Sequence, residues 1–125
     1  MNKYAQVAIK AIELVNKKEL DIINAWKICA KEVFGDTPSA LKGCPRNAFL
    51  GLCEEGMILG IEKGNYTTSL KNKTYALNAV EEIKMDESLV NNPRDLWKKV
   101  VSSNKAHNQQ MNVVCELYKR GLIKI

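Results

Sequence analysis

Apolar residues recur at the three- and four-residue spacing of an α-helix along most of this chain, and glycine or proline repeatedly interrupts the pattern. Gly35 follows one such stripe, where a helix can end. Pro45 and Pro93 stand where helices can begin, because proline fits the first helical turn. The pattern predicts an all-α fold of about six short helices, over residues 4–15, 19–34, 45–55, 70–84, 93–101 and 105–120.

The helical period disappears between Met57 and Thr68. Gly60 and Gly64 are turn residues in this stretch, and the short segments beside them are compatible with strands. We therefore leave open a small two-stranded β-hairpin near residues 57–68.

Length and composition indicate one folded unit. A chain of 125 residues has the size of a single domain and can bury about two-thirds of the surface that its unfolded form exposes. Hydrophobic residues make up 46% and charged residues 26%, a balance that argues against disorder. We expect one helical domain over residues 1–125.

No segment has the pattern of a signal peptide or of a membrane span. The N-terminus begins an amphipathic segment, and no apolar run approaches the roughly 20 residues that span a bilayer. We expect a cytoplasmic protein without a membrane partner. The four cysteines include no CxxC pair and the chain has one histidine, so we expect free thiols, no metal site and no cofactor.

The net charge of +5 gives a slight preference for anionic partners. Nucleic-acid-binding proteins usually cluster their basic residues and use arginine for bidentate contacts. Here the lysines are spread along the chain and only three basic residues are arginine, namely Arg46, Arg94 and Arg120. Nucleic acid is therefore not the favoured partner.

The string GCPRNAFLGLCEEG at residues 43–56 resembles a family of small bacterial proteins of unknown function. Three further strings fit the same resemblance: Gly64-Asn65-Tyr66, Leu96-Trp97 and Gly121-Leu122-Ile123. The resemblance covers nearly the whole chain, and it implies no activity.

A weaker resemblance connects residues 54–68 with the end of a winged-helix domain. There a recognition helix leads into a short strand and a glycine-tipped wing. In this chain, however, the helix over residues 45–55 carries one arginine and two glutamates, and the wing would hold one lysine. That surface lacks the donors that a helix in a major groove normally presents.

Cys44 and His107 are the only candidates for catalysis. We expect Cys44 to cap the helix that begins at Pro45, where backbone N–H groups and Arg46 can make a thiol more nucleophilic. His107 is the only histidine that can act as a general base. The simpler interpretation is a structural cap for Cys44, and a solvated position in a helical first turn for His107.

Arg46, Asn47, Asn65 and Tyr66 are the candidate binding residues. Tyr66 lies on the glycine-flanked loop and is the aromatic residue that we expect to be partly exposed. The neighbouring carboxylates Glu54 and Glu55 point about 100° apart on a helix, which favours solvated positions over joint acid–base catalysis.

The function remains unknown from these observations. Helical domains without a catalytic motif most often act through their surfaces, so we favour a small binding or adaptor protein that contacts another protein or a second copy of itself. One alternative is a winged-helix-like nucleic-acid-binding protein. The other is a thiol-dependent enzyme that uses Cys44.

Overall fold

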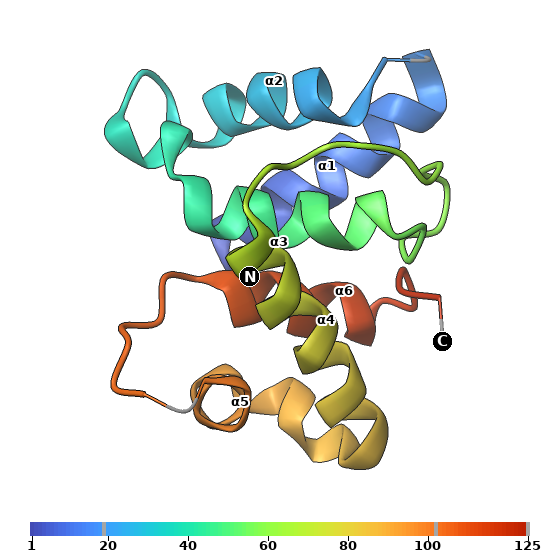
Figure 1. Cartoon of the computed structure of the whole chain (residues 1–125). Coiled ribbons are helices and arrows are strands. Elements are labelled where there is room, and N and C mark those ends of the chain that lie inside the picture. The colour runs from blue at the N-terminus through green and yellow to red at the C-terminus, as the bar shows by residue number, and fades with distance from the viewer. Residues whose placement is uncertain (19, 102, 125) are drawn as a thin grey trace.

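The computed structural model describes residues 1–18, 20–101 and 103–124. These residues form six α-helices and two short 3₁₀ helices, so the predicted all-α fold is confirmed (Figure 1). The elements are α1 (Lys3–Lys18), α2 (Ile22–Phe34), η1 (Pro38–Leu41), α3 (Gly43–Glu54), α4 (Leu70–Met85), η2 (Glu87–Asn91), α5 (Pro93–Val100) and α6 (Gln110–Lys119).

Helices α1 and α2 pack against each other along one side of the molecule (Figure 1). The Asp21 carboxylate caps α2 by accepting the Asn24 N–H at 2.9 Å, which satisfies a donor that a helix start leaves free. Helix α2 ends at Phe34 and is followed by Gly35, whose φ of +69° suits glycine, as the sequence indicates. The break expected after Val15 is wrong, because α1 continues to Lys18.

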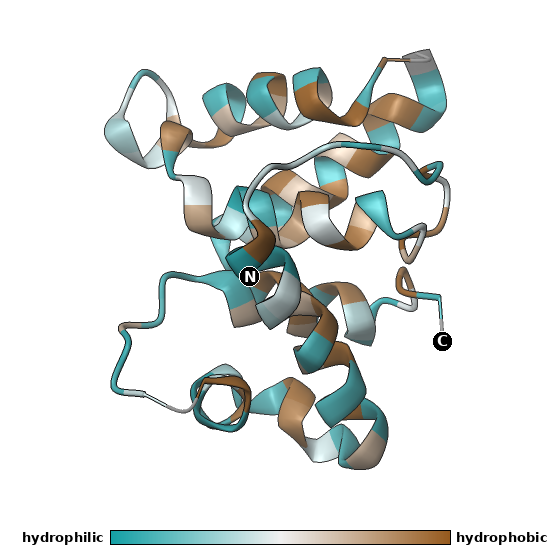
Figure 2. Ribbon diagram, in the orientation of Figure 1, coloured by the Kyte–Doolittle hydropathy of each residue, from teal (hydrophilic) through white to brown (hydrophobic). Residues whose placement is uncertain are grey.

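Helix α3 lies at the centre and contacts α1, α2, α4 and α6. Its apolar side chains from Ala48 to Cys53 are buried, and Phe49 stacks on Trp26 of α2 with 5.3 Å between ring centroids. At Gly51, α3 approaches α4 so closely that an added Cβ would lie 2.7 Å from the Lys73 Cα atom. Figure 2 shows apolar residues on the inward-facing sides of these helices.

The hairpin left open near residues 57–68 does not form. Ile58 instead makes an isolated antiparallel bridge with Ile123 near the end of the chain. The Leu59 N–H donates to the Leu122 carbonyl at 2.9 Å, and the Lys124 N–H donates to the Met57 carbonyl at 2.7 Å. Because the backbone of 57–59 pairs with 122–124, it is not available to pair with residues 66–68. The rest of the segment crosses back over α3 before α4 begins (Figure 1).

Helix α6 begins at Gln110, later than the expected residue 105. The Gln110 side chain is 2% exposed and explains this start. It accepts the Asn108 N–H at 2.8 Å and donates to Asn72 of α4 at 3.1 Å, which holds the preceding segment outside the helix. Gln109 adopts a left-handed backbone with φ of +73°.

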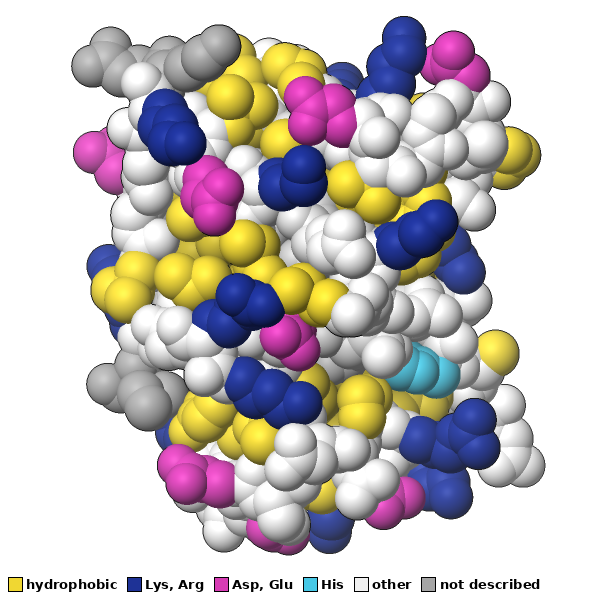
Figure 3. Space-filling model, turned by 180° about the vertical axis from the view of Figure 1, so that it is seen from behind, with side chains coloured by type: hydrophobic (Ala, Val, Ile, Leu, Met, Phe, Trp, Pro, Cys, Tyr) yellow, Lys and Arg dark blue, Asp and Glu magenta, His cyan; other side chains and the backbone are white. Residues whose placement is uncertain are grey.

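The surface carries charges of both signs. Seen from behind, the Lys and Arg side chains of the described residues lie among Asp and Glu side chains and form no single basic patch on this face (Figure 3). Within the described residues, no helix combines the length and the apolar character that crossing a bilayer requires.

Candidate functional site

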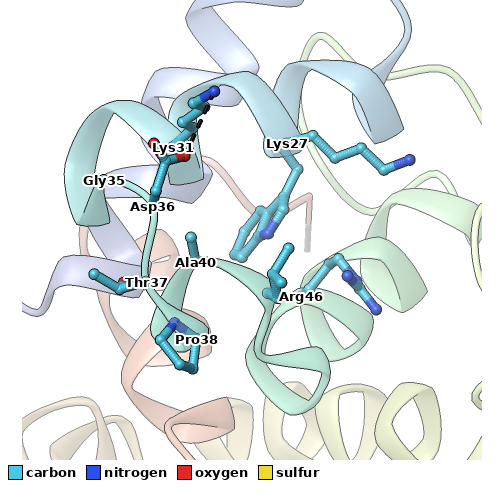
Figure 4. A pocket seen from close by; sticks show the side chains of 10 residues that line it. Lys27, Lys31, Gly35, Asp36, Thr37, Pro38, Ala40 and Arg46 are labelled. Carbon is cyan, nitrogen blue, oxygen red and sulfur yellow. Dashed lines mark ion pairs between the residues drawn. The ribbon is translucent and has the colours of Figure 1, made fainter.

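Two adjacent hollows lie beside α2 and α3, the first bordered by η1 and the second by loop residues 65–68. The first, here called the apolar cavity, has a volume of about 590 Å³ and is shown in Figure 4. Its lining residues are Trp26, Lys27, Lys31, Gly35, Asp36, Thr37, Pro38, Ala40, Leu41 and Arg46. The second, here called the polar groove, has a volume of about 500 Å³. Its lining residues are Ile23, Lys27, Arg46, Asn47, Leu50, Asn65, Tyr66, Thr67 and Thr68.

All four residues predicted to bind a partner line the polar groove. Arg46 and Asn47 come from the first half of α3, whereas Asn65 and Tyr66 come from the loop that crosses over this helix. The fold thus brings together two pairs that are well separated in the sequence. Their role in binding stays a prediction, but their common location makes a joint role geometrically feasible.

Glu54, at the end of α3, holds the loop in place. Its Oε1 accepts the Tyr66 N–H at 2.8 Å and the Thr67 N–H at 3.2 Å, and its Oε2 lies 2.6 Å from Lys73 Nζ. The hydrogen bond from Lys73, followed by those from the two backbone groups, lowers the pKa of the Glu54 carboxyl to about 2. The expected solvated position is wrong for Glu54, whose side chain is 12% exposed.

Further hydrogen bonds fix the wall of the groove. The Thr67 hydroxyl donates to Asn47 Oδ1 at 3.0 Å, which joins the loop to α3. The Tyr66 hydroxyl donates to the Glu62 carbonyl at 2.6 Å, and partial burial raises the pKa of Tyr66. Tyr66 is half-buried, so it presents a ring surface to the groove while its hydroxyl is already bonded.

Trp26 contributes a buried aromatic surface to the apolar cavity. The residue is 1% exposed, and no hydrogen bond from its indole N–H is found among the described residues. In the same part of the chain, no buried side-chain nitrogen or oxygen lacks a partner, so this N–H must reach solvent. Trp26 is also one of the residues that line the apolar cavity. At the margin, Leu41 is 76% exposed.

Charge is distributed unevenly around the apolar cavity. Lys31 pairs with Asp36 at 3.5 Å on one side. Lys27 and Arg46 line both hollows, and neither forms an ion pair with another described residue. Figure 4 shows the Lys27 and Arg46 side chains extending to the same side, away from the Lys31–Asp36 pair. Within the part of the chain that the structure describes, the border between the two hollows therefore carries two cations, Lys27 and Arg46, that form no ion pair.

The two candidate catalytic residues are not joined in the described structure. Cys44 lies inside the first turn of α3, which begins at Gly43, so the expected capping position is wrong. His107 precedes α6 and is half-buried, so its expected place in a helical first turn is wrong too. Its Nε2 accepts the Met111 N–H at 3.0 Å, and no hydrogen bond between described atoms links its ring to Cys44.

The four thiols differ in how deeply they are buried. Cys29, Cys53 and Cys115 are buried and Cys44 is half-buried. Burial raises the pKa of the first three, that of Cys115 to about 12. In the described ranges, no three His, Cys, Asp or Glu side chains are grouped as metal ligands would be.

Several residues of this site carry no recognisable signal in the sequence. The helical pattern places Trp26 in the core, which is correct, but it cannot show that the ring also lines a cavity. In the sequence, Lys27 looks like an ordinary solvated lysine. It borders the cavity only because η1 packs beside α2. The Glu54–Lys73 pair joins residues 19 positions apart, and a helical repeat gives no information on such a contact.

A family model described as a family of unknown function, DUF6979, matches residues 1–124. The chain belongs to this family. The resemblance to a family of unknown function is thereby confirmed, whereas bacterial origin and the diagnostic value of residues 43–56 stay predictions. No curated protein and no solved structure matches the chain.

Proposed function

We propose that this chain is a small protein-binding domain whose recognition surface combines the apolar cavity and the polar groove. Sites of this size bind ligands through a mainly apolar lining with a few placed polar groups. The apolar cavity supplies the apolar lining and the polar groove supplies the polar groups. The two hollows meet at Lys27 and Arg46. A cytoplasmic location is part of this proposal.

One observation supports the proposal most directly. Arg46, Asn47, Asn65 and Tyr66 line one groove beside an apolar cavity, and the walls are held by the Glu54 and Asn47 hydrogen bonds. A preformed surface pays less conformational entropy on binding than one that must become ordered. An extended segment of a partner protein can occupy both hollows at once.

The alternatives have less support. The winged-helix interpretation needs a strand pair after α3, and residues 57–59 pair with the chain end instead. A thiol enzyme needs an activating partner for Cys44, and His107 uses its Nε2 to accept the Met111 N–H. Both hypotheses remain outcomes of the experiments below.

A random peptide library displayed on phage tests the proposal. The library is panned on the wild-type protein and then on the charge-reversal variant Lys27→Glu/Arg46→Glu. We expect enriched peptides that bind the wild type and lose at least tenfold in affinity for the variant, because two groove cations are replaced by anions. The absence of such peptides would contradict the proposal.

Two controls accompany the panning. Lys98→Glu/Lys99→Glu applies the same charge change to two exposed lysines of α5, and peptide affinity should stay within about threefold because these residues lie outside both hollows. Duplex DNA is titrated in parallel at low and physiological salt. Salt-sensitive DNA binding that depends on Lys27 and Arg46, without any enriched peptide, would replace protein binding by nucleic-acid binding.

A further inference from the structure

We infer that the bound segment is acidic and carries one large apolar side chain, which enters the apolar cavity while a neighbouring carboxylate lies at Lys27 and Arg46. This inference rests on the proposed function and specifies its partner. It follows from the order in which the structure places apolar surface and charge along the two hollows.

The apolar cavity is suited to a large side chain. Trp26, Pro38, Ala40 and Leu41 give it apolar walls, and its volume of about 590 Å³ is within the range of binding sites that enclose most of their ligand. Leu41 is 76% exposed, so an apolar group in the cavity would also cover a side chain that now faces water.

The charged groups define which ligand charge is favoured. Asp36, the acidic residue of the cavity lining, lies 3.5 Å from Lys31, whose opposite charge partly offsets its own. Lys27 and Arg46 have no acidic partner among the described residues, and both line the border of the cavity and the groove. A carboxylate at this border would gain a charge-assisted hydrogen bond from Arg46 without displacing an existing ion pair.

The two requirements act on neighbouring positions of one segment. Lys27 and Arg46 are lining residues of the apolar cavity itself, so an acidic residue that reaches them lies close to the apolar residue inside it. Beyond this border, Asn47 and Asn65 of the polar groove can bond the backbone of the segment. A basic segment would be repelled at the border, and a segment without a large apolar residue would leave the cavity unfilled.

The peptides enriched by panning provide the test. We expect a shared pattern of one large apolar residue with Asp or Glu beside it. Ala40→Trp should fill the cavity and lower the affinity of these peptides at least tenfold. This is the loss expected when a large apolar side chain of the peptide stays in water. Ala106→Trp is the matched control, because Ala106 is an exposed alanine that lines neither hollow.

Two further measurements cover the case in which Ala40→Trp does not fold. Leu41→Asp changes an exposed residue and adds a negative charge at the cavity, so it should lower the affinity of acidic peptides by a similar factor. In a Trp97→Phe background, Trp26 is the remaining tryptophan, and its emission should shift when a peptide enters the cavity.

The outcomes separate this inference from the proposed function. Peptides that depend on Lys27 and Arg46 but show no apolar preference, and bind Ala40→Trp and Leu41→Asp like the wild type, would overturn the inference and leave the function standing. Peptides that are basic in composition would overturn it too. A library without any peptide that depends on these cations would overturn both.

Discussion

Glu54 of α3 and Lys73 of α4 form an ion pair with 2.6 Å between Oε2 and Nζ, and both side chains are largely buried. The same carboxylate accepts the backbone N–H groups of Tyr66 and Thr67. One side chain therefore fixes both the contact between two helices and the loop that forms a wall of the polar groove. Four predictions concern this framework and the two candidate catalytic residues.

Glu54→Gln should lower the free energy of unfolding by about 1–3 kcal/mol at pH 7, because it removes a charged acceptor and leaves Lys73 without its closest partner. The folded-state pKa of about 2 is below the ordinary value, so this stabilisation is fully present above about pH 4.5 and is lost as the pH falls towards 2. Urea unfolding of both proteins at several pH values measures the difference.

Glu55→Gln is the control for that change. Glu55 also contacts Lys73, at 3.3 Å, but its side chain is 41% exposed, so its loss should cost less than about 1 kcal/mol. The predicted link to pH would be contradicted if the free energies of unfolding of the wild type and Glu54→Gln differed by the same amount at pH 7 and at pH 3.

Gly51→Ala should destabilise the fold by about 1–3 kcal/mol through overpacking. The added Cβ would meet the Lys73 Cα atom at 2.7 Å, and a backbone atom in a packed helix cannot move aside cheaply. Thermal unfolding measures the change. Gly43→Ala, in the same helix, is the matched control, because its Cβ would meet only side-chain atoms at 3.5 Å. Equal stabilities of the two variants would exclude a close helix contact at Gly51.

His107 should titrate with a pKa below that of an exposed histidine. Burial is the main cause, and the nearby charges of Arg94 and Lys42 act in the same direction. Since the chain contains one histidine, its ring proton resonances can be followed by NMR without ambiguity. The folded state binds fewer protons here, so stability should fall as the pH decreases below about 6.5. His107→Gln should remove this part of the pH dependence, and a titration at or above 6.5 would contradict the prediction.

Iodoacetamide should modify Cys44 first in the native protein. Cys44 is half-buried, whereas Cys29, Cys53 and Cys115 are buried and the pKa of each is raised. Mass spectrometry after short labelling should show one adduct, which Cys44→Ser abolishes, and four adducts in denaturant. Equal labelling of all four thiols in the native state would contradict the described burial. It would also remove the basis for a thiol enzyme that uses Cys44.

Local chemistry in the sequence predicts much of the helical architecture. The helix expected over residues 70–84 is observed as Leu70–Met85, and the one expected over 93–101 as Pro93–Val100. Both have an apolar stripe, and Pro93 gives the second a defined start. Two predictions were wrong because a distant partner decides the conformation. Gln110 bonds Asn72 of another helix and delays the start of α6, and Ile123 pairs with Ile58 and prevents the hairpin.

The candidate site, too, has properties that the sequence predicts and properties that depend on contacts between distant residues. The residue types of Arg46, Asn47, Asn65 and Tyr66, and their positions at a helix start and on a glycine-flanked loop, are properties of the sequence. Their common groove depends on Glu54, which bonds the loop to α3, and the cavity beside them depends on η1 folding back beside α2. Helical periodicity and turn propensity act between near neighbours, so the sequence by itself determined the helices and their buried faces. The approach of α2, α3 and the loop is set by packing and hydrogen bonds between residues far apart in the chain, so only the tertiary structure decided where the two hollows lie and which residues line them.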